Sequence, residues 1–200
     1  MALPASDSFD RSNSGTLNFA SWTDYAAGWH IASNQAAEDS PNPPAVSYWN
    51  ADSFANDQWS QCTLITLDTA ADSGAGPAVR CNSSGDCIFV QTNTVDTRLY
   101  QRMGASTYTQ LGSTITDGTK FAANDICYIQ VVGTSVTVKK GGSGGSTIIS
   151  ASLVSGPSTG AAGIFGVKDT TVAVIDLWSG GNTGSAQSQA PRSMQTLRRR

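Results

Sequence analysis

Short runs of β-branched and aromatic residues recur along the chain, and a cluster of Gly, Asn, Asp, Ser or Pro separates each run from the next. This pattern is typical of strands joined by tight turns in a sandwich or barrel. Residues that favour helices, such as Glu, Lys, Leu and Met, are scarce, and Glu38 is the only glutamate. The sequence therefore predicts an all-β fold with more strands than one sheet holds.

The predicted strands alternate with polar segments over almost the whole chain. Segment 34–44 is polar and contains three prolines, so it is predicted to be a surface loop. The GGSGGS segment at 141–146 is expected to be a flexible turn. We expect strands over residues 6–10, 16–19, 28–33, 45–50, 58–68, 76–82, 87–92, 97–102, 107–115, 126–132, 135–139, 147–153, 160–167 and 172–179.

One hairpin is especially clear in the pattern. Ile129 and Val131 alternate with other residues before a Gly133-Thr134 turn, and Val136 and Val138 alternate after it. Such alternation predicts two paired strands with one apolar face. The predicted core consists of Phe9, Ile65, Leu67, Val79, Ile129, Val131, Val136 and Val138.

The chain of 200 residues is long enough to bury one sizeable core, so we expect one sandwich domain over residues 1–181. Residues 182–200 form a polar, basic tail, in which the large apolar side chains are Met194 and Leu197. Two such groups do not offset the ordering of that many residues, at about 1 to 2 kcal/mol of backbone entropy each. The sequence therefore predicts a flexible tail that is held in an extended form by contacts outside its own domain.

Charge divides the chain into an acidic body and a basic tail. Residues 1–176 hold all 15 acidic residues and 8 of the 12 basic ones, so the net charge of the body is −7. This charge disfavours nucleic acid as a partner of the body, whereas the tail arginines could pair with carboxylates on a neighbouring protein subunit. These arginines are Arg192, Arg198, Arg199 and Arg200.

The sequence shows no segment of the kind that enters or crosses a membrane. The N-terminal residues lack a basic region followed by an apolar region, which a secretory signal requires. No stretch approaches the ~18 apolar residues of a membrane span. We therefore expect no membrane span.

Four cysteines leave two interpretations open. Cys81 and Cys87 flank a turn-like segment, N-S-S-G-D, so a disulfide across the base of a hairpin is possible. Such a bond would indicate an oxidising location. The alternative is a pair of small buried thiols, which is also the expectation for Cys62 and Cys127 inside apolar strands. The spacing of the four is not that of a zinc site.

Aromatic residues supply candidates for a glycan-binding platform, because sugar rings stack on aromatic planes. Tyr48 and Trp49 are neighbours in a predicted strand and must face opposite sides, so one of them is a candidate exposed platform. Trp59 is the third candidate. A core role is the alternative for each, because about half of the side chains in a sandwich strand point inward.

Three aspartates could come together if the first and last strands pair. Asp7, Asp10 and Asp176 would then offer oxygen ligands for calcium. The alternative is that they are solvent-facing carboxylates of turns and edges. No other cofactor is expected.

An ordered set of motifs spans residues 6 to 181. It comprises a D-x-F strand in SDSFDR, a GWHIASN unit, a GAGPAVR strand, a V-x-G-x-x-V-x-V hairpin and a closing D-x-W-x-G strand. Together these motifs resemble the concanavalin A-like lectin/glucanase superfamily, which is also called laminin-G-like. The resemblance implies a two-sheet antiparallel jelly-roll sandwich. Small domains of this appearance occur in phage and bacterial genomes as carbohydrate-binding or virion-surface modules.

The resemblance does not extend to the catalytic signature of glucan-cleaving members, an E-x-D-x-E strand that supplies paired carboxylates. Glu38 has Asp39 beside it, and adjacent side chains on an extended chain point apart. We therefore expect a non-catalytic protein. The hypothesis is a structural or decoration protein of a virion surface, anchored by its tail to a partner subunit. The alternatives are an extracellular carbohydrate-binding module and, third, a glycoside hydrolase.

Overall fold

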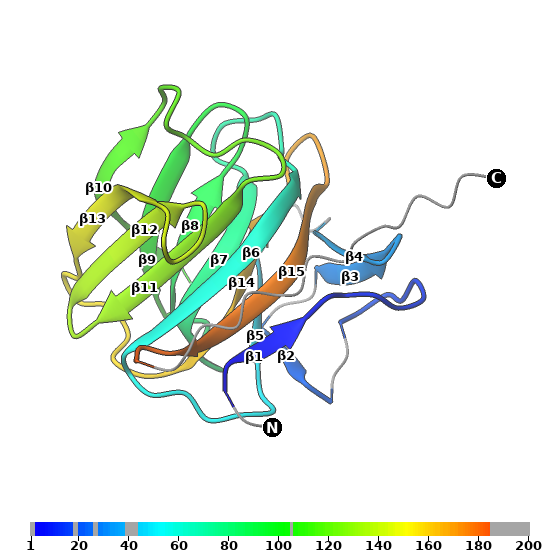
Figure 1. Ribbon diagram of the computed structural model, residues 1–200, viewed down its shortest axis with the longest axis horizontal. Helices are drawn as coiled ribbons and strands as arrows, with labels where there is room; N and C mark the ends of the chain where they lie inside the picture. Colours follow the sequence, from blue (N-terminus) through cyan, green and yellow to red (C-terminus); the bar gives the residue numbers. More distant parts are fainter. Residues whose placement is uncertain (1–2, 18–19, 26–27, 39–43, 105, 185–200) are drawn as a thin grey trace.

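The computed structural model describes residues 3–17, 20–25, 28–38, 44–104 and 106–184 (Figure 1). Within these residues every regular element is a β-strand, and the strands form two antiparallel sheets that pack face to face. None of the described residues forms a helix that is long and apolar enough to cross a membrane. The all-β sandwich predicted from the sequence is therefore confirmed.

The larger sheet contains the first and the last described strands. Its members are β1 (Ala5–Asp7), β3 (Trp29–Ala32), β4 (Gln35–Glu38), β6 (Gln58–Thr66), β11 (Ile126–Val132), β12 (Ser135–Lys140), β13 (Ser146–Ser152) and β15 (Ala173–Asn182). Their order is β13-β12-β11-β6-β15-β4-β3, and β1 pairs with β15 beside this path. Figure 1 shows β1 lying along β15, so the two ends of the domain meet in one sheet.

The smaller sheet has seven strands. Its members are β2 (Trp22–Tyr25), β5 (Ala45–Trp49), β7 (Gly74–Cys81), β8 (Cys87–Thr92), β9 (Thr97–Met103), β10 (Thr107–Ile115) and β14 (Ala161–Val167). Their order is β10-β9-β8-β7-β14-β5-β2. The central strands β7 and β8 are buried at every position, which means that both faces of this sheet are covered there.

The inward-facing residues of both sheets form one core. In the β11–β12 hairpin, Val131 pairs with Val136 and Ile129 pairs with Val138, and all four side chains are fully buried. Gly133 in the connecting turn has a φ of 56°, a left-handed conformation that glycine adopts without steric strain. The predicted hairpin and its apolar face are therefore confirmed.

Three tryptophans pack together at one side of the core. Trp22 lies 4.6 Å from Trp178 and 5.5 Å from Trp49, measured between ring centroids. Each indole N–H has a partner: Trp22 donates to Asp7 at 2.8 Å, Trp49 to an aspartate of the next loop, and Trp178 to a serine of β6 at 2.9 Å. This cluster joins β2 and β5 of one sheet to β15 of the other.

Strand β4 was expected to be part of a loop over 34–44, and this part of the prediction is wrong. Gln35–Glu38 pairs with β3 on one side and with β15 on the other. The three prolines come after Glu38, so the strand keeps every backbone N–H that it needs for both ladders. Ala36 and Ala37 are small, and both are buried.

The inward phase of β6 also differs from the expectation at one position. Leu64 is fully buried in the core, whereas Ile65 is half-buried and points away from it. Both residues are apolar neighbours in a strand, so their sequence does not show which one faces inward. The other predicted core residues are buried.

Candidate functional site

A second apolar cluster lies on the outer face of the smaller sheet. Sandwich sheets commonly present polar residues on that face, so an apolar cluster outside the core marks a candidate binding surface. Half-buried tyrosines, Tyr25, Tyr48 and Tyr100, pack against it together with Val167. The buried members are Val46, Ala78, Cys81, Cys87, Phe89 and Phe165.

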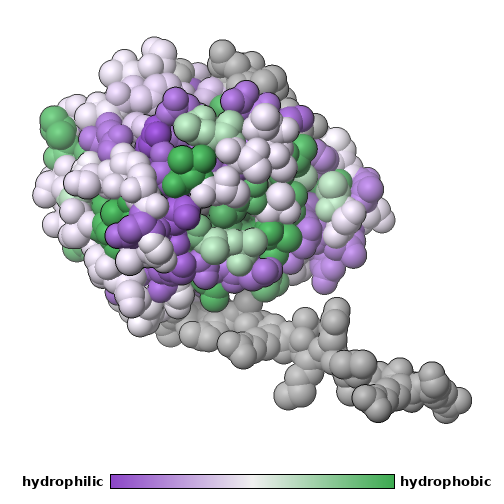
Figure 2. Space-filling view, turned by 90° about the horizontal axis from the view of Figure 1, so that it is seen from above, coloured by the Kyte–Doolittle hydropathy of each residue, from purple (hydrophilic) through white to green (hydrophobic). Residues whose placement is uncertain are grey.

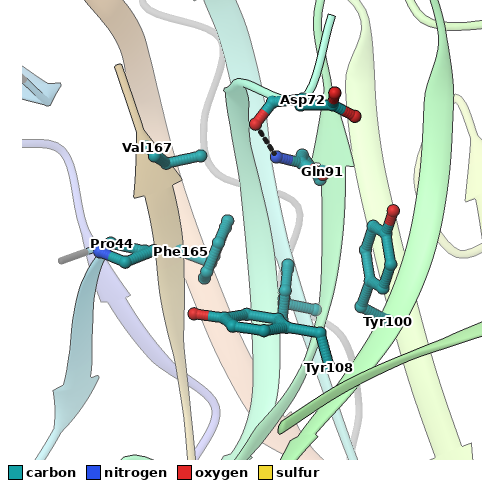
Figure 3. A pocket seen from close by; sticks show the side chains of 8 residues that line it. Pro44, Asp72, Gln91, Tyr100, Tyr108, Phe165 and Val167 are labelled. Carbon is teal, nitrogen blue, oxygen red and sulfur yellow. Dashed lines mark hydrogen bonds between the residues drawn. The ribbon is translucent and has the colours of Figure 1, made fainter. Parts of the chain in front are cut away.

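A hollow of about 290 Å³ opens in this face over strands β8, β9, β10 and β14, and we call it the cleft (Figure 3). Strand alternation explains its lining: Phe89 and Gln91 of β8 face the cleft, whereas Ile88 and Val90 face the core. The lining residues are Pro44, Asp72, Phe89, Gln91, Tyr100, Tyr108, Phe165 and Val167.

Stacked rings form the floor and two sides of the cleft. Phe89 and Phe165 stack at 3.6 Å between ring centroids, and both side chains are almost fully buried. Tyr100 stacks on Phe89 at 5.7 Å, and Tyr108 meets Phe89 edge-on at 6.3 Å. Figure 3 shows the rings of Tyr100, Tyr108 and Phe165 arranged around the hollow. Tyr108 keeps 41% of its surface exposed, so it offers a ring face to a ligand.

A buried arginine positions Tyr108. The guanidinium carbon of Arg102 lies 5.1 Å from the ring centroid of Tyr25 and 5.5 Å from that of Tyr108. A cation placed between two rings in this way is attracted to both. Burial raises the pKa of Tyr108, while the charge of Arg102 opposes this rise. Tyr108 is therefore a neutral phenol at pH 7, with a hydroxyl group that can donate and accept.

Charged and amide groups form the polar rim. Arg98 binds the carboxylates of Asp72 and Asp96, the latter at 2.6 Å. Gln91 donates from Nε2 to the Asp72 carbonyl oxygen at 3.0 Å, as Figure 3 shows. The cleft thus combines an apolar floor with a few fixed polar groups at one edge, which is the usual character of a small-ligand site.

The loop of residues 67–73, which joins β6 to β7 and carries Asp72, is held in place by Asp68, which is fully buried. Its carboxylate accepts hydrogen bonds from the backbone of Ala70 at 3.1 Å, of Asp169 at 2.8 Å and of Thr171 at 3.2 Å, and from the hydroxyl of Thr170 at 2.9 Å. Burial opposes ionisation, but the hydrogen bonds from Asp169 and its neighbours outweigh it and lower the pKa of Asp68 to about 2.

Replacing Asp68 by asparagine should destabilise the domain by about 2 kcal/mol at pH 7, because several donors lose a charged acceptor. A depressed pKa stabilises the fold above the unfolded value of 3.8, and this contribution is lost as the pH falls towards 2. The difference in unfolding free energy between wild type and Asp68→Asn, measured by urea denaturation, should therefore become smaller from pH 5 to pH 2.5. The matched control is Asp117→Asn, at an exposed aspartate whose carboxylate binds Thr119; an equal loss in both variants would contradict this role.

The aromatic residues that the sequence singled out do not form the cleft. Tyr48 lies on the outer face of the smaller sheet in the second apolar cluster, half-buried, and beyond the cleft lining. Trp49 points into the core and is 4% exposed. Trp59 is 1% exposed and stacks on Tyr128 at 6.0 Å. Neither tryptophan offers a ring face to a sugar, so the candidate platform moves from β5 and β6 to β9 and β10.

The predicted pairing of first and last strands is present, and it brings the three aspartates near one another. Asp7 of β1 pairs with Trp178 of β15. Burial raises the pKa of Asp176, and the charges of Asp10 and Asp7 contribute to this rise. Asp7 already binds Arg11 at 2.7 Å. Among the described residues no group of three His, Cys, Asp or Glu is arranged to hold a metal ion, so calcium binding stays a prediction.

Two further sequence-based candidates stay predictions. Cys81 and Cys87 are buried free thiols that lie side by side, so a bond between them stays a prediction. The predicted partner-binding residues lie outside the described residues. They are Arg192, Met194, Leu197, Arg198, Arg199 and Arg200.

Comparison with solved structures identifies proteins of the same architecture. The carbohydrate-binding module CBM66 from Bacillus subtilis is similar with a TM-score of 0.55 and 14% identity, over 81% of this chain and 92% of that one. A β-1,3-1,4-glucanase (lichenase) from a mouse hindgut metagenome has a TM-score of 0.56 and 10% identity, over 88% and 98%. A xylan β-1,4-xylosidase from Bacillus halodurans C-125 has a TM-score of 0.61 and 10% identity, over 91% of this chain but 40% of that enzyme.

The chain therefore has the concanavalin A-like jelly-roll fold, as the sequence resemblance predicted. No protein-family model matches the sequence, and no curated protein matches it. Carbohydrate-binding modules and glycoside hydrolases both occur among the structures of this fold, and at these identities the likeness shows the fold alone.

Proposed function

We propose that this domain binds carbohydrate in the cleft and does not cleave it. The observation that carries the proposal is the pair of tyrosines, Tyr100 and Tyr108, beside an apolar floor on the outer face of a sheet. The C–H faces of a sugar ring pack on such planes, while phenol hydroxyls and rim groups bind its hydroxyl groups. The similarity to a carbohydrate-binding module supports this reading through fold alone.

The size and polarity of the cleft favour a short neutral ligand segment. A volume of about 290 Å³ is near the lower end for small-ligand sites, so the cleft suits the end or a short stretch of a glycan. Arg98 and Asp72 neutralise each other at the rim, and Gln91 adds an amide. Hydrogen bonds from these groups would distinguish sugars that differ in the arrangement of their hydroxyl groups.

Among the described residues the cleft lining holds no pair of carboxylates, which supports a non-catalytic role. Glycosidases use two carboxyl groups about 5 to 9.5 Å apart across the scissile bond. Asp72 is the one carboxylate among the described residues that line the cleft, and it is bound to Arg98. We therefore place binding ahead of hydrolysis. Release of reducing ends from a polysaccharide would reverse this order.

The test of the proposal is binding to a glycan array, followed by titration calorimetry with the best ligand. Replacing Tyr108 by alanine should weaken binding about tenfold, which corresponds to about 1.4 kcal/mol of lost stacking. Tyr108→Phe keeps the ring and should stay within a few-fold of wild type. Val154→Ala, at an exposed residue outside the cleft lining, should bind as wild type does.

Two outcomes would contradict glycan binding in the cleft. One is the absence of binding to every glycan on the array, and the other is an alanine variant at Tyr108 that binds as tightly as wild type.

Running the array with calcium and with a chelator also tests the predicted calcium ion, because a calcium-dependent site would lose its signal in the chelator.

A place on a virion surface is the more specific part of the functional hypothesis and remains a proposal from the sequence. It rests on the basic tail, which lies outside the described residues. A decoration role and glycan binding are compatible, because a surface-anchored domain would still present its cleft. The alternative is an extracellular carbohydrate-binding module, which would bind its ligand in the same cleft.

A further inference from the structure

Cys62 and Cys127 face each other across the middle of the larger sheet. They are directly paired residues of β6 and β11, and both are fully buried in the core. Two residues along, Leu64 donates its N–H to the Asp125 carbonyl oxygen at 3.0 Å, so the cysteines occupy a hydrogen-bonded position of the antiparallel ladder. Cα atoms at such positions are about 5.5 Å apart, within the range that a disulfide spans.

Cys81 and Cys87 face each other in the smaller sheet because of a bulge. Val79 pairs with Ile88, and the Asn82 N–H donates to the Asp86 carbonyl oxygen at 3.1 Å. Between these two pairs β7 has two residues and β8 has one, which defines a β-bulge. Arg80, with a φ of 52°, is the extra residue. The bulge turns the Cys81 side chain to the outer face, where Cys87 lies by its alternation with Phe89 on β8.

The two thiols of this second pair touch. A side-chain hydrogen bond links Cys81 with Cys87, and both belong to the apolar cluster beneath Tyr25 and Tyr48. The position next to a hydrogen-bonded pair in a ladder brings Cα atoms to about 4.5 Å, which a disulfide also spans. Both cysteine pairs therefore have suitable backbone geometry before any bond forms.

The four cysteines of the sequence thus form two facing pairs, one in each sheet, and none is left over. We propose that these pairs are the sites of two cross-strand disulfides, Cys62–Cys127 and Cys81–Cys87. Each bond forms by exchange with a disulfide-containing oxidant. One cysteine thiolate attacks a sulfur of the oxidant and releases its first thiol, and the partner cysteine then displaces the second. Both cysteines lose their protons, and the oxidant takes up the two electrons.

Burial of the thiols determines at which step of folding the disulfide exchange takes place. Removal from water raises the pKa of the Cys62, Cys81 and Cys127 thiols, and a neighbouring thiol adds to the rise for Cys81 and Cys127. Thiols that hold their protons are poor nucleophiles, so exchange occurs while the sheets are still open. Once the sandwich closes, the same burial shields both bonds from reductants. The Cys62–Cys127 bond encloses strands β7 to β10, and long loops gain most from closure.

The test is refolding of the denatured, reduced chain with oxidised glutathione, followed by intact-mass measurement and peptide mapping without reduction. The expected product has no free thiol in denaturant and yields two linked peptide pairs, Cys62 with Cys127 and Cys81 with Cys87. The melting temperature of the oxidised protein should exceed that of the reduced protein by about 5 to 10 °C.

Matched double variants separate the two bonds. Cys81→Ala with Cys87→Ala should keep the first bond and most of the thermal shift, whereas Cys62→Ala with Cys127→Ala should keep the second bond and the smaller part. Refolded wild type that retains four titratable thiols, carries glutathione adducts, or links Cys62 with Cys81 or Cys87 would overturn the proposal. These outcomes do not depend on glycan binding, so the two proposals fail independently.

Discussion

Replacing Val131 by aspartate is expected to unfold the domain. Val131 is fully buried on β11, where it pairs with Val136 and belongs to the core between the sheets. An aspartate there would bury a carboxylate without a partner, which costs more than about 4 kcal/mol. Domains of this kind are stable by only about 5 to 15 kcal/mol, so most or all of the stability is lost. Circular dichroism during heating measures the effect.

The matched control is the same substitution one residue further along the strand. Val132 points to the opposite face and is 45% exposed, so Val132→Asp should leave the melting temperature within a few degrees of wild type. Equal melting of the two variants would show that the inward phase of β11 is assigned to the wrong residues.

Replacing Arg80 by methionine should cost about 3 to 5 kcal/mol, because Arg80 joins three loops at one end of the sandwich. The buried guanidinium donates to the carbonyl oxygens of Asn56 at 2.8 Å, Gly133 at 2.8 Å and Pro157 at 3.1 Å. Methionine fills similar space but leaves these acceptors without their donor. Guanidinium chloride denaturation measures the loss of unfolding free energy. The stability of Arg80→Lys should lie between those of wild type and Arg80→Met, because an ammonium group lacks the planar fork of a guanidinium.

A second arginine serves as the control for this loss. Arg11 binds Asp7 through two hydrogen bonds at 2.7 and 3.0 Å, and its side chain is 30% exposed. Partly exposed pairs of this kind contribute about 1 kcal/mol or less, so Arg11→Met should be mild. If both methionine variants lose the same stability, the three loop contacts of Arg80 contribute nothing beyond an ordinary surface pair.

Fold class was predictable because it depends on patterns within short segments. Alternating valines and a Gly-containing turn determine the β11–β12 hairpin wherever the rest of the chain lies. Strand phase was less predictable where two apolar residues adjoin. At Leu64 and Ile65 the choice depends on how β6 pairs with its neighbours, and its ladder with β15 contains register shifts.

The candidate site was hardly predictable, because it is assembled from separate strands. Phe89, Tyr100, Tyr108 and Phe165 come from four different strands, and no local pattern joins them. One signal could have indicated the place. Strands β8 and β14 carry apolar residues in both phases, so both of their faces need cover, and only one face can belong to the core. The facing of Cys62 and Cys127 was missed for the same reason, since strand order is not written in any one segment. Cys81 and Cys87 were candidates from the sequence because they flank a single turn.

Apolar side chains that stay outside the core are distributed over the surface. On the face shown in Figure 2, green apolar groups are separated by purple polar ones. A distribution of this kind is normal for a folded domain and does not by itself define an interface. The large exposed apolar residues are Val95, Tyr108, Ile126, Val132, Val154 and Leu177. Among these residues, Tyr108 is the one that lines the cleft.

The position of β15 has a consequence for how the chain is made in the cell. This strand is the last described element, yet it lies inside the larger sheet, between β6 and β4, and it also carries β1. While a ribosome is still making residues 173–182, the earlier strands β1, β3 and β4 have no partner that joins them to the sheet. A nascent chain whose central strand is made last exposes unpaired strand edges until that strand is available. Such a chain depends on chaperones or on rapid synthesis of the last strand.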